Sequence, residues 1–152
     1  MKATGLRIGK IGLLSALCAA SPLFCRAEPQ LGDYGKAIAV QTLLQTGTTA
    51  SGQPIVYPKT DKPEVRMLLV EIPPGTETGW HRHPMPCYAY ILSGNVTVEL
   101  ENGKSYTFHA GEGFAETVGT LHNGKNPGKE PVKILMTVTG EKAVPTTERA
   151  GK

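Results

Sequence analysis

Beyond residue 28 the sequence predicts an all-β domain, either a sandwich or an antiparallel barrel. Three observations favour this class. The chain of 152 residues carries 18 Gly and 12 Pro, which break helices. The helical pattern is weak throughout this part. Short runs rich in Val, Ile, Thr, Tyr and Phe recur at nearly regular spacing, with turn residues between them, as is typical of sandwiches and barrels. The length fits one domain.

The expected strands are bounded by recognisable turn residues. Pro73-Pro74-Gly75 ends one strand, Ser93-Gly94-Asn95 reads as a hairpin turn, and Glu101-Asn102-Gly103-Lys104 reads as a second hairpin turn. The segment 47–63 is rich in Thr, Gly, Ser and Pro and predicts a loop. After Thr139 the chain is polar and predicts a loose tail. The expected strands are 38–45, 65–72, 88–92, 96–100, 105–108, 114–118 and 132–139.

Two of these strands carry a facing pattern. Val96, Val98 and Leu100 alternate with polar residues, so they should face the core. The strand 88–92 is apolar on both faces. One face should line the barrel, and the other should be covered by the N-terminal strand or by a second subunit. This pattern predicts a homodimer.

Residues 1–27 have the layout of a secretory signal peptide. Basic residues precede an apolar run at 11–20, and Cys25-Arg26-Ala27 forms a small-residue cleavage site. Cleavage would leave residues 28–152 in the periplasm or outside the cell, with no membrane attachment. It removes four basic residues and no acidic one, so the formal charge falls from +3 to −1. No basic patch then favours nucleic-acid binding.

Cleavage also leaves one cysteine. Cys18 and Cys25 lie in the predicted leader, and Cys87 remains without an internal disulfide partner. A single cysteine in an exported protein indicates a reactive thiol, an intermolecular partner or a metal ligand.

Three histidines fall into two clusters. The first reads Gly75-x5-His81-x-His83-x3-Cys87-x6-Gly94, and the second reads Gly111-x5-Thr117-x-Gly119-x2-His122-x3-Asn126. On a strand, His81 and His83 share one face, with Cα atoms roughly 6 to 7 Å apart. His122 follows a turn and could face them across a barrel. Imidazole and thiolate together suit Zn, Cu, Ni or Fe rather than Mg or Ca.

The two clusters resemble the paired motifs of the cupin superfamily, G-x5-H-x-H-x3,4-E-x6-G and G-x5-P-x-G-x2-H-x3-N. The resemblance covers about 65–139 and implies that residues 28–152 form a single antiparallel β-barrel, the double-stranded β-helix or jelly roll. It also implies one divalent transition metal held by His81, His83 and His122. The alternative is a barrel that binds its ligand directly, with these histidines at its rim.

Two positions depart from the family pattern. Cys87 stands where the family has a glutamate ligand, and Thr117 stands where it has proline. We expect Cys87 to be the fourth ligand; a buried hydrophobe and a surface thiol are its alternatives. Met85 lies near Cys87 in the sequence, and the combination of His, Cys and Met is typical of blue-copper sites. The favoured alternative is a loop methionine that packs on the mouth of the barrel. Glu116 is the candidate catalytic residue, either orienting a histidine or moving protons, and the alternative is a solvated glutamate.

Two functions remain open at this stage. The resemblance implies a metal-dependent enzyme acting on a small organic molecule, similar to a dioxygenase or an isomerase, with substrate at an open metal position. A closed site with four ligands would instead indicate a non-catalytic protein that handles metal or binds a small ligand. The number of open positions at the metal separates them, and the fold alone does not.

Overall fold

The computed structural model describes residues 37–151, and in this part the chain forms strands and no helix. Within the described residues there is accordingly no helix long and apolar enough to cross a membrane. The predicted leader, 1–27, lies outside them. The strands are β1 (Pro63–Ile72), β2 (His81–Arg82), β3 (Cys87–Ser93), β4 (Asn95–Leu100), β5 (Ser105–His109), β6 (Gly113–Ala115), β7 (His122–Lys125), β8 (Val132–Glu141) and β9 (Glu148–Arg149).

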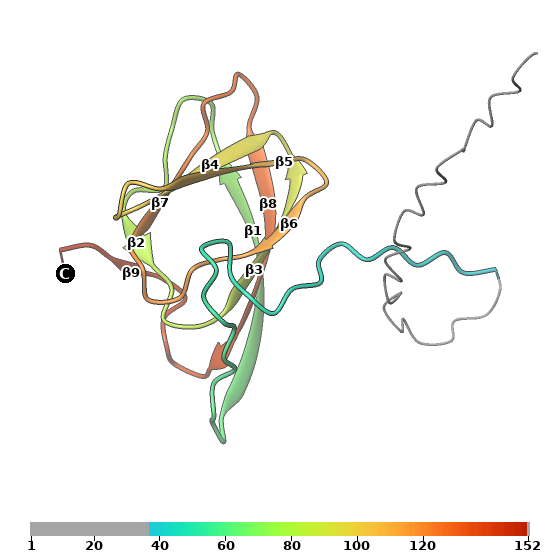
Figure 1. Cartoon of the computed structure of the whole chain (residues 1–152), viewed down its shortest axis with the longest axis vertical. Coiled ribbons are helices and arrows are strands. Elements are labelled where there is room, and N and C mark those ends of the chain that lie inside the picture. The colour runs from blue at the N-terminus through green and yellow to red at the C-terminus, as the bar shows by residue number, and fades with distance from the viewer. Residues whose placement is uncertain (1–36, 152) are drawn as a thin grey trace, which may run out of the picture. The chain divides into compact units, whose positions relative to one another are not determined.

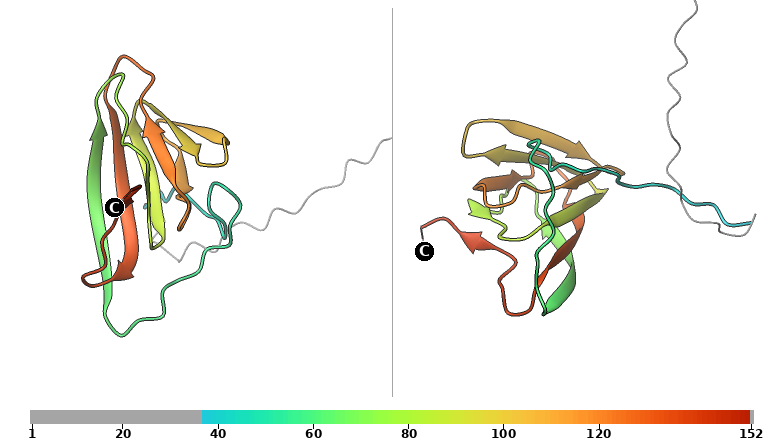
Figure 2. Two further views of the ribbon diagram at one scale, coloured as in Figure 1. Left: turned by 90° about the vertical axis from the view of Figure 1, so that its left-hand side faces the viewer. Right: turned by 60° about the horizontal axis from the view of Figure 1, so that its bottom comes forward.

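The strands form two antiparallel sheets, in the orders β1-β8-β3-β6 and β5-β4-β7-β2-β9 (Figure 1). The main hydrophobic core lies between them, because it draws buried residues from both sheets. These include Ile72 and Ile134 from the first sheet and Val96 and Leu100 from the second. This arrangement is the double-stranded β-helix, so the predicted fold class is confirmed. Figure 2 shows the long strands β1 and β8 running side by side, paired from Pro63↔Glu141 to Ile72↔Val132.

The predicted alternation along β4 is confirmed. Val96, Val98 and Leu100 are 1%, 6% and 2% exposed. On β3 the buried face consists of Ala89 and Ile91, together with Cys87 at the start of the strand. Period-two alternation therefore decided which side chains enter the barrel.

One of the two predicted hairpins is wrong. The turn 101–104 does join the antiparallel pair β4 and β5. At Gly94, however, β3 and β4 do not pair, because β3 belongs to the first sheet and β4 to the second. Gly94 has a φ of +76°, and a Cβ there would lie 3.0 Å from Val132 Cγ2. Glycine is required at this corner, where the chain passes from one sheet to the other.

The predicted strand at 38–45 is also wrong, since this segment has no ladder partner. Leu43 and Leu44 instead line a small hollow with Tyr88 and Tyr90, on the outer face of β3. These two leucines therefore lie beside the second apolar face of β3 without forming a strand.

The predicted loose tail after Thr139 is wrong as well. β8 continues to Glu141, and β9 pairs with β2 through His81↔Arg149 and Arg82↔Glu148. An ion pair of 2.8 Å between Arg82 and Glu148 adds to this contact. The tail is polar because one of its sides faces solvent, while backbone hydrogen bonds hold it in place. Figure 1 shows the C-terminal end of the described chain beside β2.

Candidate metal centre

Segments far apart in the sequence place the three histidines together. His81 begins β2 and His122 begins β7, and their Cα atoms are partners in the antiparallel pair. His83 follows β2 and forms an isolated bridge with Val118. His83 and His122 are both 1% exposed, whereas His81 is partly exposed.

The three imidazole rings converge. Their centroids are 5.1 Å apart for His81–His83, 4.5 Å for His81–His122 and 5.0 Å for His83–His122. Each ring offers one ligand nitrogen, and these three nitrogens all lie within 4.8 Å of one another. One ion could therefore contact all three.

Backbone carbonyls fix the tautomer of every ring. Nδ1 of His81 donates to the oxygen of Gly79 at 2.7 Å, and Nδ1 of His83 donates to that of Thr146 at 2.8 Å. Nδ1 of His122 donates to the oxygen of Thr120 at 2.9 Å. A carbonyl only accepts, so each Nδ1 carries the hydrogen and each neutral ring keeps a lone pair on Nε2.

These lone pairs are left without donors. Nε2 of His83 and Nε2 of His122 are buried and make no hydrogen bond within the described residues. Buried polar atoms are nearly always paired, so unpaired ones at the centre of a cluster need a partner that is not part of the chain. Histidine ligands commonly donate Nδ1–H to a carbonyl while Nε2 binds metal.

Burial keeps the rings neutral. It lowers the pKa of His83 to about 4, although the hydrogen bond to Thr146 acts in the opposite direction. Burial also lowers the pKa of His81 and of His122. Neutral imidazole is the form that binds metal. The three histidines therefore fit a transition-metal ion, in both donor chemistry and geometry.

Cys87 does not join this cluster. Its side chain is 1% exposed, and its thiol lies 3.4 Å from the carbonyl oxygen of Met85, to which it donates. It packs with Met85, Met136 and Val138 in a second hydrophobic cluster. Burial, followed by the charge of Glu116, raises the pKa of the Cys87 thiol to about 12. The structure thus presents it as a buried protonated thiol, and its role as a ligand stays a prediction.

Glu116 points into the barrel beside the histidines. It is 8% exposed, and one of its carboxylate oxygens lies 3.5 Å from Nε2 of His122. Burial raises the pKa of Glu116 to about 7, while the nearby His81 acts to lower it. The alternative of a solvated surface glutamate does not fit this position.

A cavity of about 190 Å³ opens beside His81 and His83. Residues from the C-terminal segment form part of its wall, namely Thr146, Thr147 and Arg149. The guanidinium of Arg149 donates to the carbonyl oxygen of Thr78 at 3.4 Å and has no carboxylate partner among the described residues. Sequence reasoning missed these residues, because a two-residue strand in a polar segment leaves no periodic pattern.

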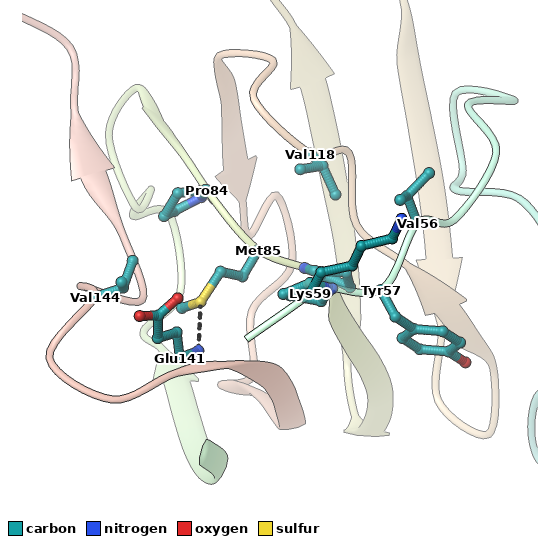
Figure 3. Close-up of a pocket in the computed structure, with 10 residues that line it drawn as sticks. Val56, Tyr57, Lys59, Pro84, Met85, Val118, Glu141 and Val144 are labelled. Atoms are coloured by element: carbon teal, nitrogen blue, oxygen red, sulfur yellow. Dashed lines mark hydrogen bonds between the residues drawn. The ribbon is translucent and has the colours of Figure 1, made fainter. Parts of the chain in front are cut away.

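A larger hollow of about 470 Å³ lies around the Pro84-Met85-Pro86 loop (Figure 3). None of the three histidines lines it. The sulfur of Met85 accepts a hydrogen bond of 3.1 Å from the backbone N–H of Glu141. This contact favours a packed loop methionine over a blue-copper ligand. The cavity of about 190 Å³, which His81 and His83 line, is therefore the one that adjoins the candidate metal centre.

Other residues of the two sequence clusters support the site. Thr117, at the position of the family's proline, is buried with its hydroxyl 3.3 Å from Nδ1 of His122. Asn126 is structural, because its amide donates to the carbonyls of Ile72 and Glu130 and accepts from Gly128 N–H.

Comparison with known proteins agrees with this architecture. Residues 68–138, which hold both histidine clusters, match the family model described as "Cupin domain". No curated protein sequence matches the chain.

Two solved structures have similar folds. One is an oxalate decarboxylase of Lactobacillus farciminis in complex with formate, with 23% identity and a TM-score of 0.50, covering 57% of this chain and 26% of that one. The other is the DMSP lyase DddQ of Ruegeria pomeroyi DSS-3, with 19% identity and a TM-score of 0.51, covering 65% of this chain and 47% of that one. This chain spans less than half of either, and such identities show the fold alone.

Proposed function

We propose that the chain is a cupin, since residues 68–138 match that family model, and that it is a metal-dependent enzyme acting on a small organic molecule. The observation that carries the proposal is the convergence of three Nε2 lone pairs beside a cavity. His81, His83 and His122 would hold one divalent ion. Three imidazoles suit Zn, Cu, Ni or Fe. When bound, such an ion supplies Lewis acidity or redox chemistry to a ligand at an open position.

The cavity beside His81 and His83 indicates the kind of substrate. Its volume of about 190 Å³ admits only a few non-hydrogen atoms. Arg149 on its wall provides a positive charge that is free to pair with an anion. Arginine binds carboxylates through two parallel hydrogen bonds. We therefore propose a small carboxylate as the substrate, in a reaction of the dioxygenase or isomerase type.

One observation favours a second candidate function. No carboxylate, lysine or tyrosine lines the cavity of about 190 Å³. Without a further acid or base at the mouth, the protein would bind a metal and a small ligand and release them unchanged. This candidate is a non-catalytic cupin that handles metal or senses a ligand.

The location and the assembly belong to the same proposal. Residues 1–27 would direct export, so that the mature chain 28–152 acts in the periplasm or outside the cell. N-terminal sequencing of the exported protein tests this point. The protein would act as a homodimer that joins through β1. This edge strand of the first sheet exposes Val65, Met67 and Leu69, each about two-thirds accessible at 65%, 64% and 66%. Exposed apolar edge strands are ready sites for pairing between chains.

Metal analysis of protein purified from its own compartment tests the function. We expect about one transition-metal ion per chain in the wild type and none in His83→Ala or His122→Ala. Lys104→Gln, a change on the distant hairpin, should keep the ion. The metal-loaded protein is then screened for turnover of small carboxylates. Stoichiometric binding without turnover would favour the second candidate, and a wild type without any bound ion would contradict both.

A further inference from the structure

The buried carboxylate of Glu116 lacks a donor. At 8% exposure, the side chain makes one polar contact among the described residues, with Nε2 of His122 at 3.5 Å. Burying a carboxylate without hydrogen bonds or a cation is strongly unfavourable. The position is therefore stable if the carboxyl group takes up a proton, which its raised pKa of about 7 allows, or if a cation lies next to it.

The contact with His122 cannot supply that compensation in its neutral form. Because Nδ1 of His122 donates to Thr120, its Nε2 carries a lone pair. When Glu116 is ionised, two acceptor atoms thus face each other at 3.5 Å. Two ligand atoms that each lie about 2.1 Å from one ion are about 3.0 Å apart when the ligand–metal–ligand angle is a right angle. They are about 3.4 Å apart when that angle is tetrahedral. The observed separation is close to the distance between two ligands of one metal ion.

A space of suitable size lies between these groups. His81, His122 and Glu116 line an inner cavity of about 30 Å³. This volume is about that of one water molecule, and so it is large enough for one ion. The wider cavity of about 190 Å³ shares His81 in its lining with this inner cavity and also reaches His83. An ion bound at the histidines could therefore contact Glu116 and also an external ligand in the wider cavity.

Strand pairing explains why the carboxylate comes from the residue directly after β6. Tyr88 pairs with Ala115, so Cys87 and Glu116 are opposite each other, and the N–H of Glu116 donates to the carbonyl of Cys87 at 2.8 Å. Side chains of opposite residues lie on the same face of a sheet. The thiol is directed to the carbonyl of Met85, and the neighbouring strand brings an oxygen towards the histidines.

We propose that Glu116 is the oxygen ligand of the metal, completing a set of three imidazoles and one carboxylate that lie on or directly after β2, β6 and β7. This inference rests on the proposed metal site. It replaces the proton-carrier role expected from the sequence, because a carboxylate bound to an ion is no longer a free base. A carboxylate in place of a thiolate makes the donor set harder, so such a site should accept harder ions more readily than a set that contains Cys87.

The test measures Co²⁺ affinity by competition with a chelator, together with the absorption spectrum of the bound ion. Glu116→Gln keeps the shape of the side chain and removes its charge. We expect it to weaken Co²⁺ binding roughly 10- to 100-fold and to change the spectrum. Glu101→Gln, a change of the same type at an exposed position, should leave both unchanged. The double variant Cys87→Glu/Glu116→Cys exchanges the two opposite side chains, so the pair still holds one carboxylate and one thiol. It should bind Co²⁺ with most of the affinity of the wild type.

Three outcomes would overturn the inference. If Glu116→Gln binds Co²⁺ like the wild type while His122→Ala does not, the metal site stands without Glu116. If affinity falls in Glu116→Gln and the folded exchange variant does not restore it, Glu116 only positions His122. If the wild type binds no metal, the proposed function fails as well.

If a variant fails to fold, infrared spectroscopy of the wild-type protein tests the inference without any substitution. The carboxylate stretching bands of protein with isotope-labelled glutamate should shift when one equivalent of Zn²⁺ is added. An unchanged infrared spectrum would overturn the assignment.

Discussion

The carbonyl oxygen of Thr146 accepts a hydrogen bond of 2.8 Å from Nδ1 of His83, which lies 63 residues earlier in the chain. The C-terminal segment thereby fixes the orientation of a buried ring at the centre of the histidine cluster. β9 anchors this segment against β2. The tail is therefore part of the candidate metal site as well as part of the fold.

Removing the tail should weaken metal binding. In a chain that ends at residue 143, Nδ1 of His83 loses its acceptor, and the ring is free to rotate. We expect roughly 10- to 100-fold lower Co²⁺ affinity, the usual effect of losing such a partner. A chain that ends at residue 150 keeps Thr146 and β9 and should bind like the wild type. Equal affinity for the two truncated proteins would contradict this role of Thr146.

Arg149 should control the binding of small anions. Replacing it with Gln removes the positive charge on the wall of the cavity. A hydrogen bond to a charged group contributes about 1.5 to 3 kcal/mol, so acetate binding to the metal-loaded protein should weaken roughly tenfold or more. Calorimetry measures this effect, and Lys104→Gln serves as the control. Unchanged acetate affinity in Arg149→Gln would show that the anion binds elsewhere.

The metal-free protein should lose stability in acid. Burial lowers the pKa of His83 from 6.5 to about 4, so between these values the unfolded chain binds a proton that the folded chain excludes. Stability from this group is complete above pH 6.5 and falls as the pH decreases towards 4, by about 3 kcal/mol at most. Urea unfolding in the presence of a chelator measures it. His83→Gln should flatten the slope over this range, and an equal slope in both proteins would contradict the assignment.

Cys87 should react slowly with thiol reagents at pH 8. Burial raises the pKa of its thiol to about 12, and only the thiolate is nucleophilic. We expect slow labelling both with and without metal, and fast labelling in urea. Cys87→Ser should keep its Co²⁺ affinity. A sulfur-to-cobalt charge-transfer band that disappears in Cys87→Ser would instead establish the thiolate ligand expected from the sequence.

The exposed edge of β1 should mediate dimerisation. Burying Val65, Met67 and Leu69 against a second copy would remove a row of apolar side chains from water. Sedimentation should give a dimer for the wild type and a monomer for the double variant Met67→Lys/Leu69→Glu. A monomeric wild type at high micromolar concentration would refute the homodimer.

The sequence by itself determined the fold class and the three histidines. Alternation at Val96, Val98 and Leu100 directs side chains into a barrel, because successive residues of a strand face opposite sides. The spacing of His81 and His83 placed two imidazoles near each other for the same reason. These features are local, so one short stretch of sequence is enough to show them.

Only the tertiary structure decided which other groups reach the site. Glu116 and Cys87 are 29 positions apart along the chain, and only the pairing of β3 with β6 makes them neighbours. Thr146 and Arg149 reach the histidines through β9, whose two residues have no detectable pattern. In the sequence, the residues around Gly94 have the pattern of a hairpin turn. In the structure, β3 and β4 belong to different sheets, and Gly94 lies close to Val132 where the chain passes between them. Strand partners depend on long-range packing, which composition and spacing do not encode locally.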